Sequence, residues 1–112
     1  MKKKVLIIGG SSDIGIELVN IFLKKNSYQL HLHYNTNSKV NKIYNKNCKL
    51  IKSDLFTGSE KSILKKFDNN YDIIINLVGF INSKSFENFS MKTVDKSLKI
   101  NSIIPLLIIR KS

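Results

Sequence analysis

A glycine-rich turn near the start of the chain could bind an anion. Gly9 and Gly10 end the apolar run Val5–Ile8, and Gly15 follows within the next apolar-periodic segment. Such a turn leaves backbone N–H groups bare and directs the positive end of a helix at the ligand. We therefore expect the turn to receive a pyrophosphate, as the first strand–helix turn of a dinucleotide-binding fold does.

Polar residues follow two later apolar runs. Asp54 comes just after the run Cys48–Lys52, and Asn76 closes the run Asp72–Asn76 shortly before Gly79. In an open parallel sheet, ligands bind at the carboxyl ends of the strands, where the strand order reverses. Each of these residues alone also fits a helix cap or a strand-end turn. Their agreement with the glycine turn favours a nucleotide site.

Asn101 and Pro105 lie in the last periodic segment, Met91–Ile109. Proline lacks an N–H and clashes with the carbonyl four residues before it, so a helix kinks there. The carbonyl of Asn101 is thereby released from the helical hydrogen bonds. The simpler interpretation is that Pro105 only kinks a packing helix.

These motifs together resemble the short-chain dehydrogenase/reductase family. Its first motif reads Thr-Gly-x3-Gly-x-Gly, and a later strand ends in Asn-Asn-Ala-Gly. Here Ile8 replaces the Thr, Asp13 replaces the middle Gly, and the second motif reads Asn76-Leu-Val-Gly79. The charge of Asp13 would oppose a pyrophosphate unless the carboxylate points away. The resemblance runs from Lys4 to about Ile109.

The resemblance implies hydride transfer between NAD(P)H and a small carbonyl or alcohol substrate. It covers only the first half of such a protein. We expect the family's catalytic Ser and Tyr-x3-Lys to lie beyond Ser112, and the 112-residue chain alone to be inactive. Of the family's catalytic residues, the chain supplies Asn101, whose backbone carbonyl would hold a water in the proton relay.

The resemblance also implies a set of cofactor-binding residues, with Asp54 and Leu55 beside the adenine and Gly79 beside a ribose. The set consists of Gly9, Ser11, Ser12, Asp13, Ile14, Gly15, Tyr34, Asn35, Thr36, Asp54, Leu55, Asn76, Val78 and Gly79.

The end of the second predicted strand governs the choice between NAD and NADP. NAD-binding proteins place an Asp or Glu there for the ribose 2′-hydroxyl. The segment Tyr34–Lys39 carries no carboxylate, and its neutral donors and Lys39 could accept a 2′-phosphate. We therefore expect NADP in preference to NAD.

Strands and helices that alternate along the chain would position these residues. The pattern predicts an α/β fold, a Rossmann-type doubly wound parallel sheet of order 3-2-1-4, truncated before the later strands, in one domain spanning residues 1–112. In the first helix, Ile14, Leu18, Ile21 and Phe22 are expected to face the core. The predicted strands are Val5–Ile8, Tyr28–Tyr34, Cys48–Lys52 and Asp72–Asn76. The predicted helices are Ile14–Lys25, Ser59–Phe67, Met91–Ile109 and a short lysine-rich helix through about Tyr44, with Ser11 or Ser12 capping the first.

Composition narrows the class of partner. The formal charge of +11 comes from lysines spread along the chain, with Arg110 the only arginine, so we expect no nucleic-acid partner. No apolar run is long enough to span a membrane. The lone Cys48 is typical of a reducing, cytoplasmic setting. His31 and His33 share one strand face without further ligands, which indicates packed histidines and no metal.

Two other classes of function stay open. The chain could be a non-catalytic nucleotide-binding or interaction module that kept the fold and lost the chemistry. A basic nucleic-acid binder would rest on charge alone. In the family, the helix that Met91–Ile109 resembles often lies at a dimer interface, so a homo-oligomer is expected at full length.

Overall fold

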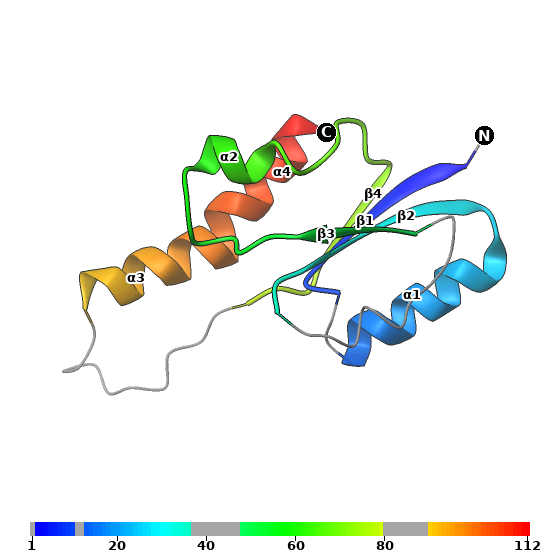
Figure 1. Ribbon diagram of the computed structural model, residues 1–112, viewed down its shortest axis with the longest axis horizontal. Coiled ribbons are helices and arrows are strands. Elements are labelled where there is room, and N and C mark those ends of the chain that lie inside the picture. Colours follow the sequence, from blue (N-terminus) through cyan, green and yellow to red (C-terminus); the bar gives the residue numbers. More distant parts are fainter. Residues whose placement is uncertain (1, 11–12, 37–47, 80–89) are drawn as a thin grey trace.

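The computed structural model describes residues 2–10, 13–36, 48–79 and 90–112, and it places one parallel sheet between helices (Figure 1). The strands are β1 (Lys3–Ile8), β2 (Tyr28–Tyr34), β3 (Cys48–Lys52) and β4 (Ile73–Asn76). The helices are α1 (Asp13–Lys25), α2 (Glu60–Leu64), α3 (Met91–Leu98), the π-helical segment η3 (Lys99–Ile103) and α4 (Ile104–Lys111). The strand order β3-β2-β1-β4 confirms the predicted order 3-2-1-4.

The central strand β1 is buried because it has a neighbour on each side and a helix layer on each face. Val5 pairs with Leu30 of β2 and with Ile73 of β4, and all pairings are parallel. The run Val5–Ile8 is completely buried. A continuous apolar run is what such a strand requires, because both rows of side chains enter a core.

Two separate cores flank the sheet, one for each row of side chains. Val5 and Ile7 point to the face that α1 covers, where they pack with Val19. Leu6 and Ile8 point to the opposite face, which α2 and α4 cover (Figure 1). The core on this face is composed of Leu6, Ile8, Ile51, Leu55, Ile63, Phe67, Tyr71, Ile104 and Ile108.

The rotation of α1 differs from the prediction. Leu18 and Phe22 pack against the core as expected. Ile14 and Ile21, also expected there, are 68% and 51% exposed, whereas Gly15 and Val19 are buried. Apolar residues occur nearly all round this helix, so periodicity alone leaves its rotation ambiguous. Gly15 decides it, because the absence of a Cβ lets this side of the helix approach the glycine turn most closely.

Helix α2 is shorter than the predicted Ser59–Phe67. Ser59 caps its start by accepting a hydrogen bond from the Ser62 N–H at 3.1 Å. After Leu64 the chain tightens, since the Phe67 N–H donates to the Leu64 carbonyl, three residues back. The predicted inward residues Ile63 and Phe67 are buried, and Leu64 is half-buried.

The interruption in the last helical stretch lies just before Pro105. The segment η3 occupies Lys99–Ile103, where the Ile104 N–H donates to the Lys99 carbonyl, five residues back. Pro105 is therefore near the start of α4, where a missing N–H costs little. The predicted caps Ser11 and Ser12 and the predicted lysine-rich helix lie outside the described residues.

Candidate nucleotide-binding site

The glycine turn leaves β1 in a conformation that only glycine adopts easily. Gly9 has φ +75°, and a Cβ there would stand 3.0 Å from the Val78 nitrogen. Gly10 is enclosed by the Leu32 side chain, and a Cβ on Gly15 would stand 2.4 Å from the Gly10 carbonyl oxygen. The turn therefore packs backbone against backbone, both with the segment after β4 and with the first turn of α1.

The segment after β4 is held against that turn by the side chain of Asn76. Its Oδ1 accepts a hydrogen bond from the Val78 N–H at 3.1 Å, and the Leu77 N–H donates to the Ile8 carbonyl at 2.8 Å. These bonds bring Val78 beside Gly9. The two predicted motifs meet at the carboxyl edge of the sheet, between β1 and β4.

His33 joins the glycine turn to the third strand, a contact that the sequence did not predict. It is 2% exposed. Its Nδ1 accepts from the Gly9 N–H at 3.0 Å, and its Nε2 lies 2.8 Å from the Ser53 carbonyl oxygen. Burial lowers the pKa of this imidazole, which keeps it neutral.

Asp54 shapes the loop after β3. Its carboxylate accepts from the Phe56 N–H and from the Thr57 hydroxyl, both at 2.9 Å. The bond from the Phe56 N–H holds the pKa of Asp54 below its ordinary value. Its neighbour Leu55 is buried in the core beneath α2 and α4. The loop therefore presents an exposed, ionised Asp54 at the same edge as the glycine turn.

Asn101 sits in the middle of η3 and next to Gly79. Among the residues that the structure describes, the atom nearest to a Cβ added to Gly79 would be the Asn101 Oδ1, at 3.8 Å. The Asn101 Nδ2 donates to the Ser97 hydroxyl at 3.2 Å. Single π-helical turns inside helices are frequent at functional sites. The structure thus brings the predicted catalytic residue beside the motif that follows β4.

Lys99, at the start of η3, reaches the Asp54 loop. Its Nζ donates to the carbonyls of Phe56 at 2.6 Å and Gly58 at 2.8 Å. The same ammonium lies 5.5 Å from the centre of the Phe56 ring. Sequence reasoning missed this contact, because no local pattern indicates that a helix lysine serves a distant loop.

The remaining predicted site residues surround these contacts. Tyr34 is half-buried at the end of β2, and Asn35 and Thr36 follow it exposed. Asp13 and Ile14 are exposed on the first turn of α1. Ser11 and Ser12 lie outside the described residues.

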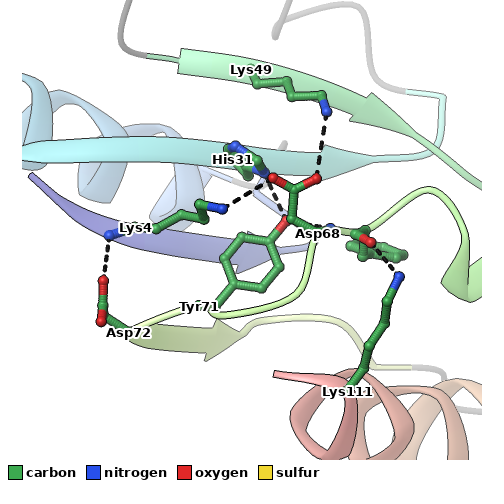
Figure 2. A network of polar contacts seen from close by, with 8 residues as sticks. Lys4, His31, Lys49, Asp68, Tyr71, Asp72 and Lys111 are labelled. Atoms are coloured by element: carbon green, nitrogen blue, oxygen red, sulfur yellow. Dashed lines mark hydrogen bonds and ion pairs between the residues drawn. The ribbon is translucent and has the colours of Figure 1, made fainter.

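The opposite edge of the sheet carries a closed polar cluster (Figure 2). Asp68 pairs with Lys4 at 3.1 Å and faces Lys49 at 3.9 Å. The Tyr71 hydroxyl lies 2.7 Å from the His31 Nδ1 and accepts from the Asp68 N–H at 3.2 Å. These groups are satisfied by one another, so the cluster ties the amino ends of the strands together.

Two further properties concern the described residues as a whole. No group of three or more His, Cys, Asp or Glu side chains in them could hold a metal ion. None of their helices has the length and apolar character needed to cross a membrane.

Burial raises the pKa of the lone thiol, Cys48, to about 11, which keeps it protonated and unreactive.

Comparison with known proteins places this geometry in a known fold. No protein-family model matches the chain, and no curated protein matches it. A short-chain dehydrogenase family protein from Francisella tularensis matches at TM-score 0.78 and 20% identity, over 99% of this chain and 45% of that one. The resemblance to short-chain dehydrogenases is thus confirmed for the fold.

Two similar structures were solved with a cofactor. A short-chain dehydrogenase from Sphingobium yanoikuyae in complex with NADPH matches at TM-score 0.79 and 18% identity, over 97% of this chain and 46% of that one. A short-chain dehydrogenase from Leptospira borgpetersenii with bound NAD+ matches at TM-score 0.74 and 24% identity, over 99% and 44%. This chain spans less than half the length of these solved structures.

Proposed function

We propose that residues 1–112 form the cofactor-binding half of an NAD(P)-dependent short-chain oxidoreductase. The observation that carries the proposal is the packing of Gly9 against the Leu77–Val78 backbone, with Gly79 and Asn101 alongside. Segments far apart in the sequence meet where the strand order reverses, which is where this class of fold binds dinucleotides. The fold shared with dehydrogenases of known structure supports the same site.

Different residues at the carboxyl edge of the sheet would bind different parts of the cofactor. The backbone N–H groups and dipole of the first turn of α1 would attract the pyrophosphate, and Gly9 and Gly15, which have no side chains, would let the backbone approach it closely. Asp13 and Ile14 belong to that turn, and Ser11 and Ser12, which precede it in the sequence, would also bind the cofactor. Asp54 and Leu55 would contact the adenine, and Asn76, Val78 and Gly79 would line the path toward the nicotinamide.

The polar end of β2 favours NADP over NAD. Tyr34, Asn35 and Thr36 bring no carboxylate to the position where NAD-binding folds need one. The Sphingobium structure was solved with NADPH and the Leptospira structure with NAD+, so this fold accommodates either cofactor.

Asn101 is the chain's contribution to catalysis. The bound nicotinamide would supply or accept a hydride for a carbonyl or alcohol. As the resemblance to short-chain dehydrogenases implies, the backbone carbonyl of Asn101 would hold a water that moves a proton. The substrate would meet Asn101 and Gly79 from the open side of the sheet edge.

We also propose a cytoplasmic, homo-oligomeric protein without nucleic-acid or membrane partners. The main alternative is a non-catalytic nucleotide-binding or interaction module. Both functions require the same cofactor site, so binding is the first property to test. A basic nucleic-acid binder would instead show DNA affinity that falls steeply with salt.

The decisive experiment titrates the chain with NADPH and NADH and compares it with Gly79→Val. Binding is followed by the fluorescence of the reduced nicotinamide, which is excited at a longer wavelength than any side chain absorbs. Gly79 is exposed, and within the described part of the chain a Cβ there would meet the Asn101 Oδ1 alone, at an ordinary contact distance of 3.8 Å. Valine should therefore fold normally yet obstruct the cofactor. Asn69→Val, exposed before the other end of β4, places the same valine side chain away from the site as a control.

We expect wild type and Asn69→Val to bind NADPH more tightly than NADH, and Gly79→Val to bind it roughly tenfold more weakly, about 1.4 kcal/mol, at an unchanged melting temperature. Equal NADPH affinity of all three proteins would show that the cofactor does not bind beside Gly79. Absence of NADPH and NADH binding in the wild type would contradict the proposed function. If the cofactor binds, an encoded Tyr-x3-Lys beyond Ser112 would distinguish an oxidoreductase from a non-catalytic module.

A further inference from the structure

The two ring nitrogens of His33 contact two different segments of the candidate site. The Gly9 N–H, 3.0 Å from Nδ1, belongs to the glycine turn after β1. The Ser53 carbonyl, 2.8 Å from Nε2, precedes Asp54 at the end of β3. His33 itself lies near the end of β2, between them in the sheet.

These contacts fix a single state of the imidazole. A backbone N–H can only donate, so Nδ1 must be the unprotonated nitrogen. A carbonyl oxygen can only accept, so Nε2 must carry the proton. An imidazolium would turn a donor toward the Gly9 N–H, and the other neutral tautomer would lose both bonds.

The side chain adds to a backbone connection at the same edge. The Gly10 N–H donates to the His33 carbonyl at 2.9 Å, and the Ser53 N–H donates to the Tyr34 carbonyl at 2.9 Å. The backbone therefore aligns the three strand ends, while the ring bridges Gly9 and Ser53 directly. Phe67, whose ring centre lies 5.9 Å away, packs against the imidazole from the core.

We propose that His33 is a positioning residue that couples the glycine turn to the Asp54 loop. Through it, the part of the site that would hold the pyrophosphate and the part that would contact the adenine keep a fixed separation. The role in cofactor binding rests on the function proposed above. The coupling between the two backbone segments does not require that function, and can be measured without a cofactor.

His31 provides a matched control within the same strand. It faces the same core, and each histidine is 2% exposed. Its hydrogen bond goes to the Tyr71 hydroxyl at the opposite edge of the sheet (Figure 2). Replacing His31 should therefore lower stability without reaching the glycine turn.

The test uses His33→Asn, His33→Gln, His33→Leu and the control His31→Leu in the 112-residue chain. Asparagine can place its Oδ1 near the position of Nδ1, and glutamine can place its Nε2 near the position of the histidine Nε2. Backbone amide exchange is followed at Gly9, Gly10, Ser53 and Phe56, and NADPH affinity is measured at a temperature where each variant is folded.

We expect His33→Leu to lose protection in both segments and to bind NADPH about tenfold more weakly. Asparagine should preserve protection at Gly9, glutamine should preserve it at Ser53, and each should recover part of the affinity. His31→Leu should leave exchange at Gly9 unchanged.

The coupling is overturned if His33→Leu exchanges like wild type in either segment, or if His31→Leu loosens both equally. Normal coupling in a chain that binds neither NADPH nor NADH would contradict the proposed function and leave the positioning role in the fold intact. Loss of coupling with unchanged NADPH affinity would overturn the link between His33 and the cofactor.

Discussion

Gly15 in the first turn of α1 lies directly against the backbone of Gly10. A Cβ on Gly15 would stand 2.4 Å from the Gly10 carbonyl oxygen and 2.6 Å from its Cα. Neither of these atoms belongs to a flexible side chain that could move aside. The contact sets both the rotation of α1 and the distance between its positive end and the glycine turn.

Gly15→Ala should therefore destabilise the chain even though alanine is the better helix former. We expect a loss of about 2 kcal/mol, typical of overpacking at a closed contact. Urea unfolding checks the value, with Asn20→Ala on the exposed side of the same helix as the control. Since Asn20→Ala should be neutral or slightly stabilising, equal stability of the two variants would contradict the close contact.

Asp13 lies in the first turn of α1, where its charge favours the helix and would oppose a bound pyrophosphate that it faces. Asp13→Asn should weaken the helix by about 0.5 kcal/mol, because a carboxylate at the positive helix end is lost. The same change should tighten NADPH binding a few-fold by removing a like charge. Thermal unfolding and NADPH titration check the two effects. Affinity that stays level or falls would show that the carboxylate does not face the cofactor.

Lys99 holds the Asp54 loop to η3 through the Phe56 and Gly58 carbonyls. Lys99→Met should free both carbonyls and destabilise the chain by about 1 kcal/mol. Amide exchange in residues 54–58 should rise, while exchange in β1 stays low. Lys92→Met, exposed on α3, controls for the loss of charge. Unchanged protection of the loop would contradict the role of Lys99.

Stability should fall when the pH drops below the ordinary histidine pKa of 6.5. Burial lowers the pKa of both His31 and His33, so the unfolded chain takes up protons that the folded chain excludes. Asp68 opposes this shift at His31, while Lys4 and Lys49 reinforce it, and Lys66 reinforces it at His33. Each histidine contributes at most about 1.4 kcal/mol per pH unit.

Urea unfolding between pH 6.5 and about pH 5 isolates this effect, because Asp54 and Asp68, whose pKa values are lowered from 3.8, begin to lose their contribution to stability only below about pH 5, where the unfolded chain's aspartates take up protons. The double variant His31→Gln/His33→Gln should flatten the dependence. A wild-type stability that stays constant or rises over this interval would contradict buried, neutral histidines.

The sheet could be predicted closely because its signals are local and strong. The bounds of β2 and β3 agree with the prediction to the residue, since each apolar run ends at polar or turn residues. The strand order followed from the alternation of strands and helices and the right-handed crossover rule. The rotation of α1 was predicted only in part, since Leu18 and Phe22 pack against the core but Ile14 and Ile21 do not. The rotation depends on a contact between Gly15 and Gly10 as well as on periodicity.

The candidate site could be predicted only as a set of residues. Gly9, Asn76 and Asn101 could be chosen from motifs, but the contacts that arrange them involve partners with no motif of their own. His33 looks like any packed strand histidine until the ends of β1 and β3 are placed beside it. Likewise, Pro105 predicted a disturbed helix, but the extent of η3 depends on packing across the molecule.

The central position of β1 in the sheet also affects how the protein folds during its synthesis on the ribosome. Strand β1 pairs with β4, which is synthesised much later, since the hydrogen-bonded Lys4 and Asp72 are 68 residues apart. At about 5–20 residues per second, roughly 3–14 s pass between their syntheses. During that time the apolar run Val5–Ile8 has no partner on its β4 side. Until β4 has been made, this edge of β1 is therefore open to pairing with another chain.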